Sequence, residues 1–179
     1  EAKKTEISDP NAFALGTSGS NNQPNVRMVL LKFYDKEGFI FYTNLESKKS
    51  QELEINELAS MCFHWKSIKR QVRVIGKVKL ISEKEADDYF NSRSYGSKIG
   101  AWASFQSSKL KSREEILEKI NNFKNLYPEK DKVKRPTWWS GWKIYPKEVE
   151  FWLEGENRIH ERLNYVNKNG EWFKELLYP

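Results

Sequence analysis

Residues 69–80, which read Lys-Arg-Gln-Val-Arg-Val-Ile-Gly-Lys-Val-Lys-Leu, carry the clearest secondary-structure pattern of the chain. Apolar residues alternate with polar ones: Val72, Val74, Val78 and Leu80 against Lys69, Gln71, Arg73, Lys77 and Lys79. Successive side chains of a strand point to opposite faces, so this alternation predicts a strand. One of its faces belongs to a core and the other faces water.

Strands are also expected on the N-terminal side of this stretch. Residues 26–34 and 39–43 flank the turn-forming sequence Asp35-Lys36-Glu37-Gly38, which predicts a hairpin. The returning strand, 39–43, is apolar on both faces, as expected for a strand that is covered on both sides. Residues 60–65 are predicted to form another strand, and a strand is expected before the turn-rich residues 19–24.

Helices are expected in the middle of the chain and strands at its end. Ser47 can cap a short helix through about Ile55, and two capping boxes, Ser82 with Glu85 and Ser112 with Glu115, mark further helix starts. After a loop around 127–136, alternation returns at 149–153, and strands at 158–166 and after the turn Asn169-Gly170 complete the pattern. We therefore predict an α+β, mainly β protein: an antiparallel barrel with flanking helices, forming a single domain over residues 1–179.

Composition excludes several classes of protein. The chain has 179 residues, a formal net charge of +6, one cysteine and two histidines. A disulfide framework and a zinc site are therefore excluded, and no apolar run or signal core marks a membrane or secreted protein. We expect a cytoplasmic protein without a membrane anchor, whose positive charge suits anionic partners such as phosphates.

Two groups of basic residues are candidates for an anion site. If residues 155–165 contain a strand, Arg158, His160 and Arg162 point to one face and could bind an anion. From these residues alone, a solvated basic strand paired with glutamates is the simpler explanation. Ser47, Lys48 and Lys49 stand at a helix start, where backbone N–H groups favour phosphate, and the alternative is an exposed helix turn.

Several motifs together resemble the pyridoxamine 5'-phosphate oxidase family. They cover nearly the whole chain in the order of the family: Arg27-Met28-Val29-Leu30-Leu31-Lys32, Phe41-Tyr42-Thr43-Asn44, Glu46-Ser47-Lys48-Lys49, Arg70-Gln71-Val72-Arg73, Ile99-Gly100-Ala101-Trp102, Gln106-Ser107-Ser108, Glu150-Phe151-Trp152 and Arg158-Ile159-His160-Glu161-Arg162. The resemblance implies a homodimeric FMN-binding split barrel with two flavin sites in the subunit interface. It also implies oxidation of pyridoxine or pyridoxamine 5'-phosphate to pyridoxal 5'-phosphate, with oxygen as the electron acceptor. Hydrogen peroxide, and ammonia from the amine, are the expected by-products.

The resemblance also assigns residues to the site. Those expected to contact FMN are Arg27, Met28, Val29, Leu30, Leu31, Lys32, Tyr42, Thr43, Lys48, Lys49, Gln71, Gln106, Ser107, Trp152 and Arg162. Those expected to contact the substrate are Lys32, Tyr89, Arg93, Ser97, Arg158 and His160, of which Arg158 and His160 are expected to act in catalysis. No metal is expected.

The sequence departs from the family at Lys48, where an arginine is common, so that a point charge replaces a bidentate fork and FMN affinity is expected to be lower. In the family an additional N-terminal segment usually helps to cover the substrate, and this chain begins at what resembles the end of that segment. Two other functions stay open: a split-barrel flavoprotein acting on another substrate, and a basic, aromatic-rich β-barrel that binds nucleic acid.

Overall fold

The computed structural model describes residues 1–179, which divide into two compact units. The sheet unit comprises Glu1–Phe41, Glu52–Lys79 and Lys143–Pro179, and the helical unit comprises Tyr42–Gln51 and Leu80–Trp142. Four elements have residues in both units: β4 (Phe39–Asn44), α2 (Lys48–Ile55), β6 (Arg70–Leu80), of which only Leu80 lies in the helical unit, and β7 (Trp139–Leu153). Whether residues 1–179 behave as one domain stays a prediction.

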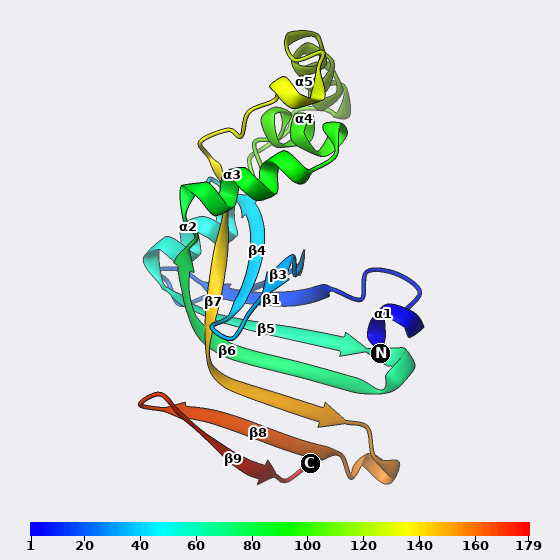
Figure 1. Cartoon of the computed structure of the whole chain (residues 1–179), viewed down its shortest axis with the longest axis vertical. Coiled ribbons are helices and arrows are strands. Elements are labelled where there is room, and N and C mark those ends of the chain that lie inside the picture. The colour runs from blue at the N-terminus through cyan, green and yellow to red at the C-terminus, as the bar shows by residue number, and fades with distance from the viewer. The chain divides into compact units, whose positions relative to one another are not determined.

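The sheet unit is a curled antiparallel sheet (Figure 1). Besides its parts of β4 and β7, it contains α1 (Ala2–Thr5), β1 (Ala12–Ser18), β2 (Pro24–Leu30), β3 (Phe33–Tyr34), β5 (Leu58–Trp65), β6 (Arg70–Leu80), β8 (Glu161–Lys168) and β9 (Glu171–Leu177). The strand order is β2-β1-β5-β6-β7-β4-β3, and β8 pairs with β7 and β9. The predicted mainly β, antiparallel architecture is confirmed.

Strand alternation builds the core of the sheet unit. In β6, Val74 and Val78 are buried while Lys77 and Lys79 are exposed, which confirms the predicted strand. In β1, Phe13 and Leu15 are fully buried, and the Phe13 ring lies edge-on to Phe41 with its centroid 6.0 Å away. Phe41 and its neighbour Ile40 are both buried, so this part of β4 is covered on both faces as predicted.

The helical unit holds α3 (Glu83–Ser92), α4 (Tyr95–Ala103) and α5 (Arg113–Leu126). Ser82 caps α3 in a complete capping box with Glu85, and the Ser112 hydroxyl caps α5 by accepting from the Glu115 N–H. The helix α4 was not predicted. Its segment contains Gly96 and Gly100, which weaken the intrinsic helix propensity on which a sequence reading depends.

The aromatic core of the helical unit forms around Phe90, Ile99, Val133 and Trp139. Trp139 is the first residue of β7, which therefore begins ten residues before the alternation that predicted it. All residues from Trp139 to Ile144 are buried, whichever face they occupy, so no alternation could reveal this part of the strand.

Two predicted strand boundaries are wrong. The expected strand at 26–34 is divided into β2 and β3 at Leu31 and Lys32. The expected strand at 158–166 begins only at Glu161, because residues Glu156–Arg158 form a 3-10 turn in which Asn157 and Arg158 have positive φ angles of 52° and 65°. The turn Asn169-Gly170 is confirmed, with φ angles of 56° and 94° that suit a two-residue hairpin.

No helix of the chain is both long and apolar enough to span a membrane.

Candidate active site

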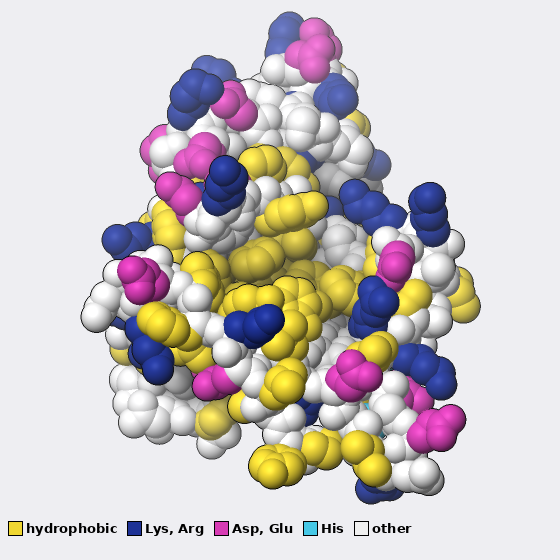
Figure 2. All heavy atoms as spheres, turned by 60° about the horizontal axis from the view of Figure 1, so that its bottom comes forward, with side chains coloured by type: hydrophobic (Ala, Val, Ile, Leu, Met, Phe, Trp, Pro, Cys, Tyr) yellow, Lys and Arg dark blue, Asp and Glu magenta, His cyan; other side chains and the backbone are white.

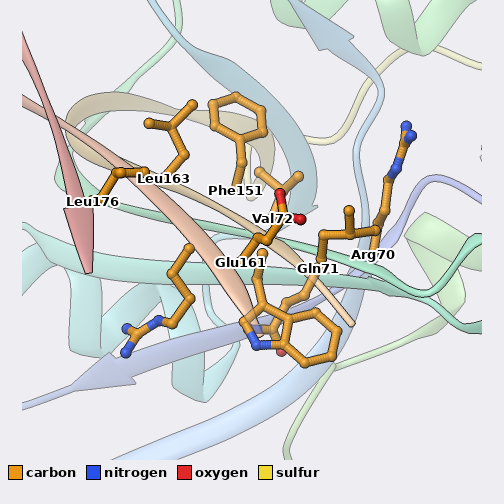
Figure 3. Close-up of a pocket in the computed structure, with 10 residues that line it drawn as sticks. Arg70, Gln71, Val72, Phe151, Glu161, Leu163 and Leu176 are labelled. Carbon is orange, nitrogen blue, oxygen red and sulfur yellow. The ribbon is translucent and has the colours of Figure 1, made fainter. Parts of the chain in front are cut away.

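A groove of about 340 Å³ in the sheet unit is lined by residues of β6, β7, β8 and β9 (Figure 3). It brings together three predicted FMN contacts, Gln71, Trp152 and Arg162. Trp152 and Arg162 are direct cross-strand partners of β7 and β8, so their side chains lie on the same face of the sheet. Phe151 and Leu163, also cross-strand partners, are the next residues along the two strands and point to the opposite face, where they supply apolar lining (Figure 3). The polar groups of Gln71 and Arg162 next to the Trp152 ring are of the kind that a cofactor site uses.

Arg162 is held by a buried carboxylate that the sequence did not reveal. Its Nε lies 2.8 Å from Oε1 of Glu150 and its Nη2 lies 3.1 Å from Oε2, a bidentate arrangement. Arg73 Nη1 donates to the same Oε2 at 2.9 Å. Glu150 is only 4% exposed, and the hydrogen bond from Arg162 holds its pKa below the ordinary value. The Arg162 guanidinium is thus oriented before any ligand binds.

Arg27 is held in the same way elsewhere in the sheet unit. Its Nη2 lies 3.1 Å from Oε2 of Glu52, and its Nη1 donates to the Thr17 hydroxyl and, at 3.2 Å, to the Leu15 carbonyl. Burial opposes ionisation of Glu52, but hydrogen bonds from Thr17, Asn25 and Arg27 outweigh it and lower the pKa of Glu52. The charge of Arg27 is therefore compensated within the protein.

The other predicted contacts of this strand region are spread along its edge. Met28, Val29 and Leu30 line a second groove of about 610 Å³, which also includes Gln71. Leu31 and Lys32 follow β2; the Lys32 N–H donates to the Ile40 carbonyl at 3.0 Å, and the residue is exposed. The structure therefore brings Met28, Val29, Leu30 and Gln71 to one groove and leaves Lys32 outside it.

Arg158 and His160 do not lie on a strand face. Arg158 is exposed and takes a positive φ, a conformation that costs a residue other than glycine about 1 to 3 kcal/mol. The His160 ring is half-buried and its centroid lies 4.6 Å from that of Trp152. His160 thus packs against Trp152, a predicted FMN contact, and Arg158 lies in a strained loop.

In the helical unit, the buried ammonium group of Lys49 hydrogen-bonds to two other predicted FMN contacts, Thr43 and Gln106. Lys49 Nζ lies 3.0 Å from Thr43 Oγ1, from Ser47 Oγ and from Gln106 Oε1, and the Thr43 hydroxyl donates to Gln106 Oε1 at 3.1 Å. Ser107 follows with a φ of 73°, while Lys48, at the start of α2, is exposed. The donors and hydroxyls of this cluster fit a phosphate or the polar edge of a flavin, so the residues present are compatible with FMN.

A second cluster of the helical unit combines stacked rings with a cation. Tyr42 and Tyr89 stack with centroids 3.9 Å apart, and Tyr42 stacks on Trp139 at 5.3 Å. The Arg93 guanidinium lies 4.6 Å from the Trp139 ring centroid and 5.5 Å from that of Phe90. Burial is the main cause that raises the pKa of Tyr42 to about 12. Both predicted substrate contacts from α3 and its C-terminus, Tyr89 and Arg93, therefore lie in this cluster.

One atom of this cluster lacks a partner. Arg93 Nη1 is buried and makes no hydrogen bond, and burial lowers the pKa of Arg93. Beyond it α4 begins, where the Ser94 hydroxyl accepts from the Ser97 N–H at 3.4 Å and donates to Ser97 Oγ at 2.9 Å. Exposed serines at the start of a helix, next to a cation, are typical of an anion-binding site.

The sequence reading missed several residues that shape these clusters. The pairing of Glu52 with Arg27 and of Glu150 with Arg162 left no local signal, because each glutamate lies more than ten residues from its arginine, although Glu150 stands in one of the family motifs. Neither Trp139 nor Ser94 was predicted to contribute to the site. The N-cap position of Ser94 before α4 would have been the one usable signal for it.

Comparison with known proteins gives full-length matches. A family model described as pyridoxamine 5'-phosphate oxidase matches residues 1–126, and one described as the pyridoxine 5'-phosphate oxidase C-terminal dimerisation region matches residues 139–179. A pyridoxine/pyridoxamine 5'-phosphate oxidase of Pelagibacter ubique is 57% identical over 180 residues, covering 100% of this chain and 86% of that protein. A protein of the same name from Brucella canis is 49% identical over 181 residues, covering 100% and 89%.

Among solved structures, PhzG from Burkholderia lata in complex with tetrahydrophenazine-1-carboxylic acid has a TM-score of 0.91 and 28% sequence identity, covering 99% of this chain and 85% of that chain. The curled antiparallel sheet and its flanking helices define the class of protein as a split barrel. Within that class, the chain belongs to the pyridoxamine 5'-phosphate oxidase family, whose members are FMN-dependent oxidoreductases.

Proposed function

We propose that this protein binds FMN and oxidises pyridoxine 5'-phosphate or pyridoxamine 5'-phosphate to pyridoxal 5'-phosphate. Oxygen is the electron acceptor, hydrogen peroxide is formed, and the amine substrate also releases ammonia. The observation that carries the proposal is the buried, unpartnered Nη1 of Arg93, since both substrates share a phosphate that such a group would bind.

The phosphate of the substrate is assigned to the cluster around Arg93. A buried guanidinium nitrogen without an acceptor is costly, and a phosphate oxygen would offset that cost through a charge-assisted hydrogen bond. Trp139 and Phe90 hold the guanidinium from the side, so the group is oriented before the phosphate arrives. Tyr89 and Ser97 complete the proposed set of phosphate ligands in the helical unit. The predicted contact of Lys32 with the substrate rests on the resemblance to the family alone.

The residues assigned to FMN rest on the resemblance to the family. They are Tyr42, Thr43, Lys48, Lys49, Gln106, Ser107, Arg27 to Lys32, Gln71, Trp152 and Arg162. When bound, FMN accepts two electrons from the substrate and passes them to oxygen. Lys49 supplies positive charge for the phosphate of FMN, and Arg162, fixed by Glu150, offers donors to an anionic edge.

Arg158 and His160 are assigned to the reacting end of the substrate. His160 lies against Trp152, and Arg158 extends from the loop directly before it. Their proposed task is to hold the pyridine ring and its exocyclic carbon in the orientation that hydride transfer requires. We expect Arg158→Ala to lower kcat by about 100-fold with less than a threefold change in the Kd for FMN. Equal losses in turnover and in FMN affinity would contradict this role.

The protein is proposed to act as a homodimer with flavin sites at the subunit interface. Residues 139–179 match a dimerisation region, and the β8–β9 hairpin exposes Phe173, Leu176 and Tyr178, which are 49%, 82% and 94% exposed. Figure 2 shows a face of the molecule on which apolar side chains gather uncovered among charged ones. Uncovered apolar area of this kind is typical of an interaction surface.

An anaerobic absorbance experiment tests the proposed function. The purified protein is loaded with FMN, its spectrum is recorded without oxygen, and pyridoxine 5'-phosphate is added. We expect the flavin band to bleach and to return in air, with formation of pyridoxal 5'-phosphate. Pyridoxine without its phosphate is the matched control and should leave the flavin oxidised at the same concentration. A flavin that stays oxidised with both phosphorylated substrates would overturn the proposal.

One observation favours a second candidate, a split-barrel flavoprotein acting on an anionic substrate without phosphate. The likeness to PhzG, whose structure holds a carboxylic acid, extends over 99% of this chain. Arg93 can bind a carboxylate as well as a phosphate. This second candidate predicts that a partly reduced ring carboxylic acid, which can give up a hydride and become aromatic, reduces the flavin, and that neither phosphorylated substrate does.

A further inference from the structure

The loop between β7 and β8 is wound so tightly that it requires glycine at position 155. A Cβ placed on Gly155 would lie 1.8 Å from the carbonyl oxygen of Ile159, much closer than any real contact. The Ile159 N–H donates to the Glu156 carbonyl at 2.9 Å, and the His160 N–H donates to the Arg158 carbonyl at 3.0 Å. These contacts close the loop and return His160 towards Gly155.

This closure places a backbone donor against one nitrogen of the His160 ring. The Gly155 N–H points at His160 Nδ1, with the two nitrogens 3.3 Å apart. A backbone amide can only donate, so Nδ1 must offer its lone pair. In the neutral ring the proton then lies on Nε2, because neutral imidazole carries one N–H. Trp152 packs against the same ring, with centroids 4.6 Å apart, and limits its rotation.

We propose that Gly155 is a positioning residue that fixes His160 as the Nε2–H tautomer, so that neutral His160 meets the substrate as a hydrogen-bond donor. The inference rests on the proposed function for its consequence in catalysis. An Nε2–H group binds an oxygen or a developing negative charge on the substrate and cannot, in that state, remove a proton from it. Gly155 thereby decides which chemistry His160 performs.

The tautomer itself is measured without substrate or turnover. The full chain is labelled with 15N-histidine and 15N-glycine, and long-range 1H–15N spectra are recorded at a pH where the ring is neutral. The chain has two histidines, so a His64→Gln variant assigns the His160 signals. We expect a pyridine-type Nδ1, a pyrrole-type Nε2, and a scalar coupling across the hydrogen bond between the Gly155 nitrogen and Nδ1. A protonated Nδ1 in the neutral ring would overturn the proposal.

Two substitutions of His160 test the consequence in the FMN-loaded enzyme. Glutamine places an amide near the position of Nε2 and can still donate there, whereas asparagine places its amide near Nδ1. We expect His160→Gln to retain at least tenfold more kcat than His160→Asn, with similar FMN binding in both. Equal kcat in the two variants would contradict the donor role.

Substitution of Gly155 links the two measurements. We expect Gly155→Ala to lose the coupling to Nδ1, to give mixed tautomers, and to lower kcat by about 100-fold with a smaller change in KM. If Gly155→Ala does not fold, the tautomer of the unmodified chain still decides the proposal. If the neutral ring is the Nε2–H tautomer and no flavin is reduced by either phosphorylated substrate, the positioning role stands and the proposed function fails.

Discussion

The two units differ in how their predicted ligand-binding arginines are compensated. In the sheet unit, Arg162 is bidentate to Glu150 and Arg27 is paired with Glu52, so both guanidinium groups have a buried carboxylate partner. In the helical unit, Arg93 lies against the rings of Trp139 and Phe90, and its Nη1 is buried without a partner. The first two arginines are thus paired within the protein, whereas the third has a buried nitrogen that no protein group accepts from.

This difference separates two ways of preparing a binding site. A paired arginine is held in one geometry, and it binds a ligand through donors that its carboxylate leaves available. Burying a guanidinium group without a partner lowers the stability of the free protein. An anion that binds the group removes this penalty, and the difference adds to the binding affinity. We therefore expect substitutions in the sheet unit to act mainly on stability and those at Arg93 to act mainly on ligand binding.

The largest expected effect is on substrate binding at Arg93. Arg93→Met keeps an unbranched apolar stem and removes the guanidinium and its charge, so we expect KM for pyridoxine 5'-phosphate to rise about 100-fold. The free energy of unfolding should stay equal or increase, because an uncompensated buried charge is removed. Steady-state kinetics and urea unfolding measure the two quantities.

Arg135 supplies the control for this substitution, since it lies in the same unit and is paired. Its Nε lies 2.7 Å from Asp87 Oδ1, and its side chain is 7% exposed. Arg135 Nη1 also donates to the Trp139 carbonyl at 2.8 Å. Arg135→Met should lower the free energy of unfolding by about 1 kcal/mol and change KM much less than Arg93→Met does. A loss of stability in Arg93→Met equal to that in Arg135→Met would remove the distinction between the two arginines.

The second effect concerns the carboxylate shared by Arg73 and Arg162. Glu150→Gln leaves two guanidinium groups without their counter-ion, and we expect the free energy of unfolding to fall by about 2 kcal/mol, since water reaches both groups and moderates the loss. Glu154→Gln is the control. Glu154 forms an exposed pair with Lys69 at 3.3 Å, which should contribute less than about 0.5 kcal/mol. Similar losses in the two variants would show that burial of Glu150 is irrelevant.

A smaller effect is expected in the dependence of the free energy of unfolding on acidic pH. The pKa values of Glu150 and Glu52 in the folded protein lie below the ordinary 4.5, so the stability they contribute is present above that pH and is lost as the pH falls through the folded values. The unfolding free energy should therefore decrease below about pH 4.5, and it should decrease less steeply in Glu150→Gln. An acid limb of unchanged slope in that variant would contradict the shifted pKa of Glu150.

No difference at all is expected between unfolding probes of the two units. Because β4, α2 and β7 each have residues in both units, we predict that residues 1–179 unfold in one transition, as a single domain. The 19F signals of 5-fluorotryptophan at Trp102 in the helical unit and at Trp172 in the sheet unit, each assigned by its loss in the Trp→Phe variant of that position, should give the same urea midpoint. Separate midpoints would show two domains.

The sequence predicted those elements whose pattern is local. The alternation of β6, the capping box of α3 and the Asn169-Gly170 turn depend on residues within a few positions of each other, and each prediction is confirmed. The start of β7 was missed because burial on both faces removes alternation. The loop before His160 was read as a strand because a positive φ at Asn157 and Arg158 leaves no trace in polarity.

The candidate site was predictable only in part, for a related reason. The resemblance to the family supplied Arg93 and Arg162, but their surroundings depend on residues that are distant in the sequence. Trp139 lies against Arg93, and Glu150 is shared by Arg162 and Arg73, which is 77 residues away. Residue type alone could not show that Arg162 is paired with a carboxylate and that Arg93 is not.

The division of the units along the chain also has a consequence for synthesis on the ribosome. All residues of the helical unit have been synthesised once Trp142 has been added, whereas the sheet unit still lacks Lys143–Pro179 at that point. Residues 80–142, made in between at about 5 to 20 residues per second, leave β6 without its partner β7 for several seconds. During that interval β6 is an open edge that can pair with another nascent chain. The alternate lysines at positions 77 and 79 place charge on that edge at the time when it is exposed.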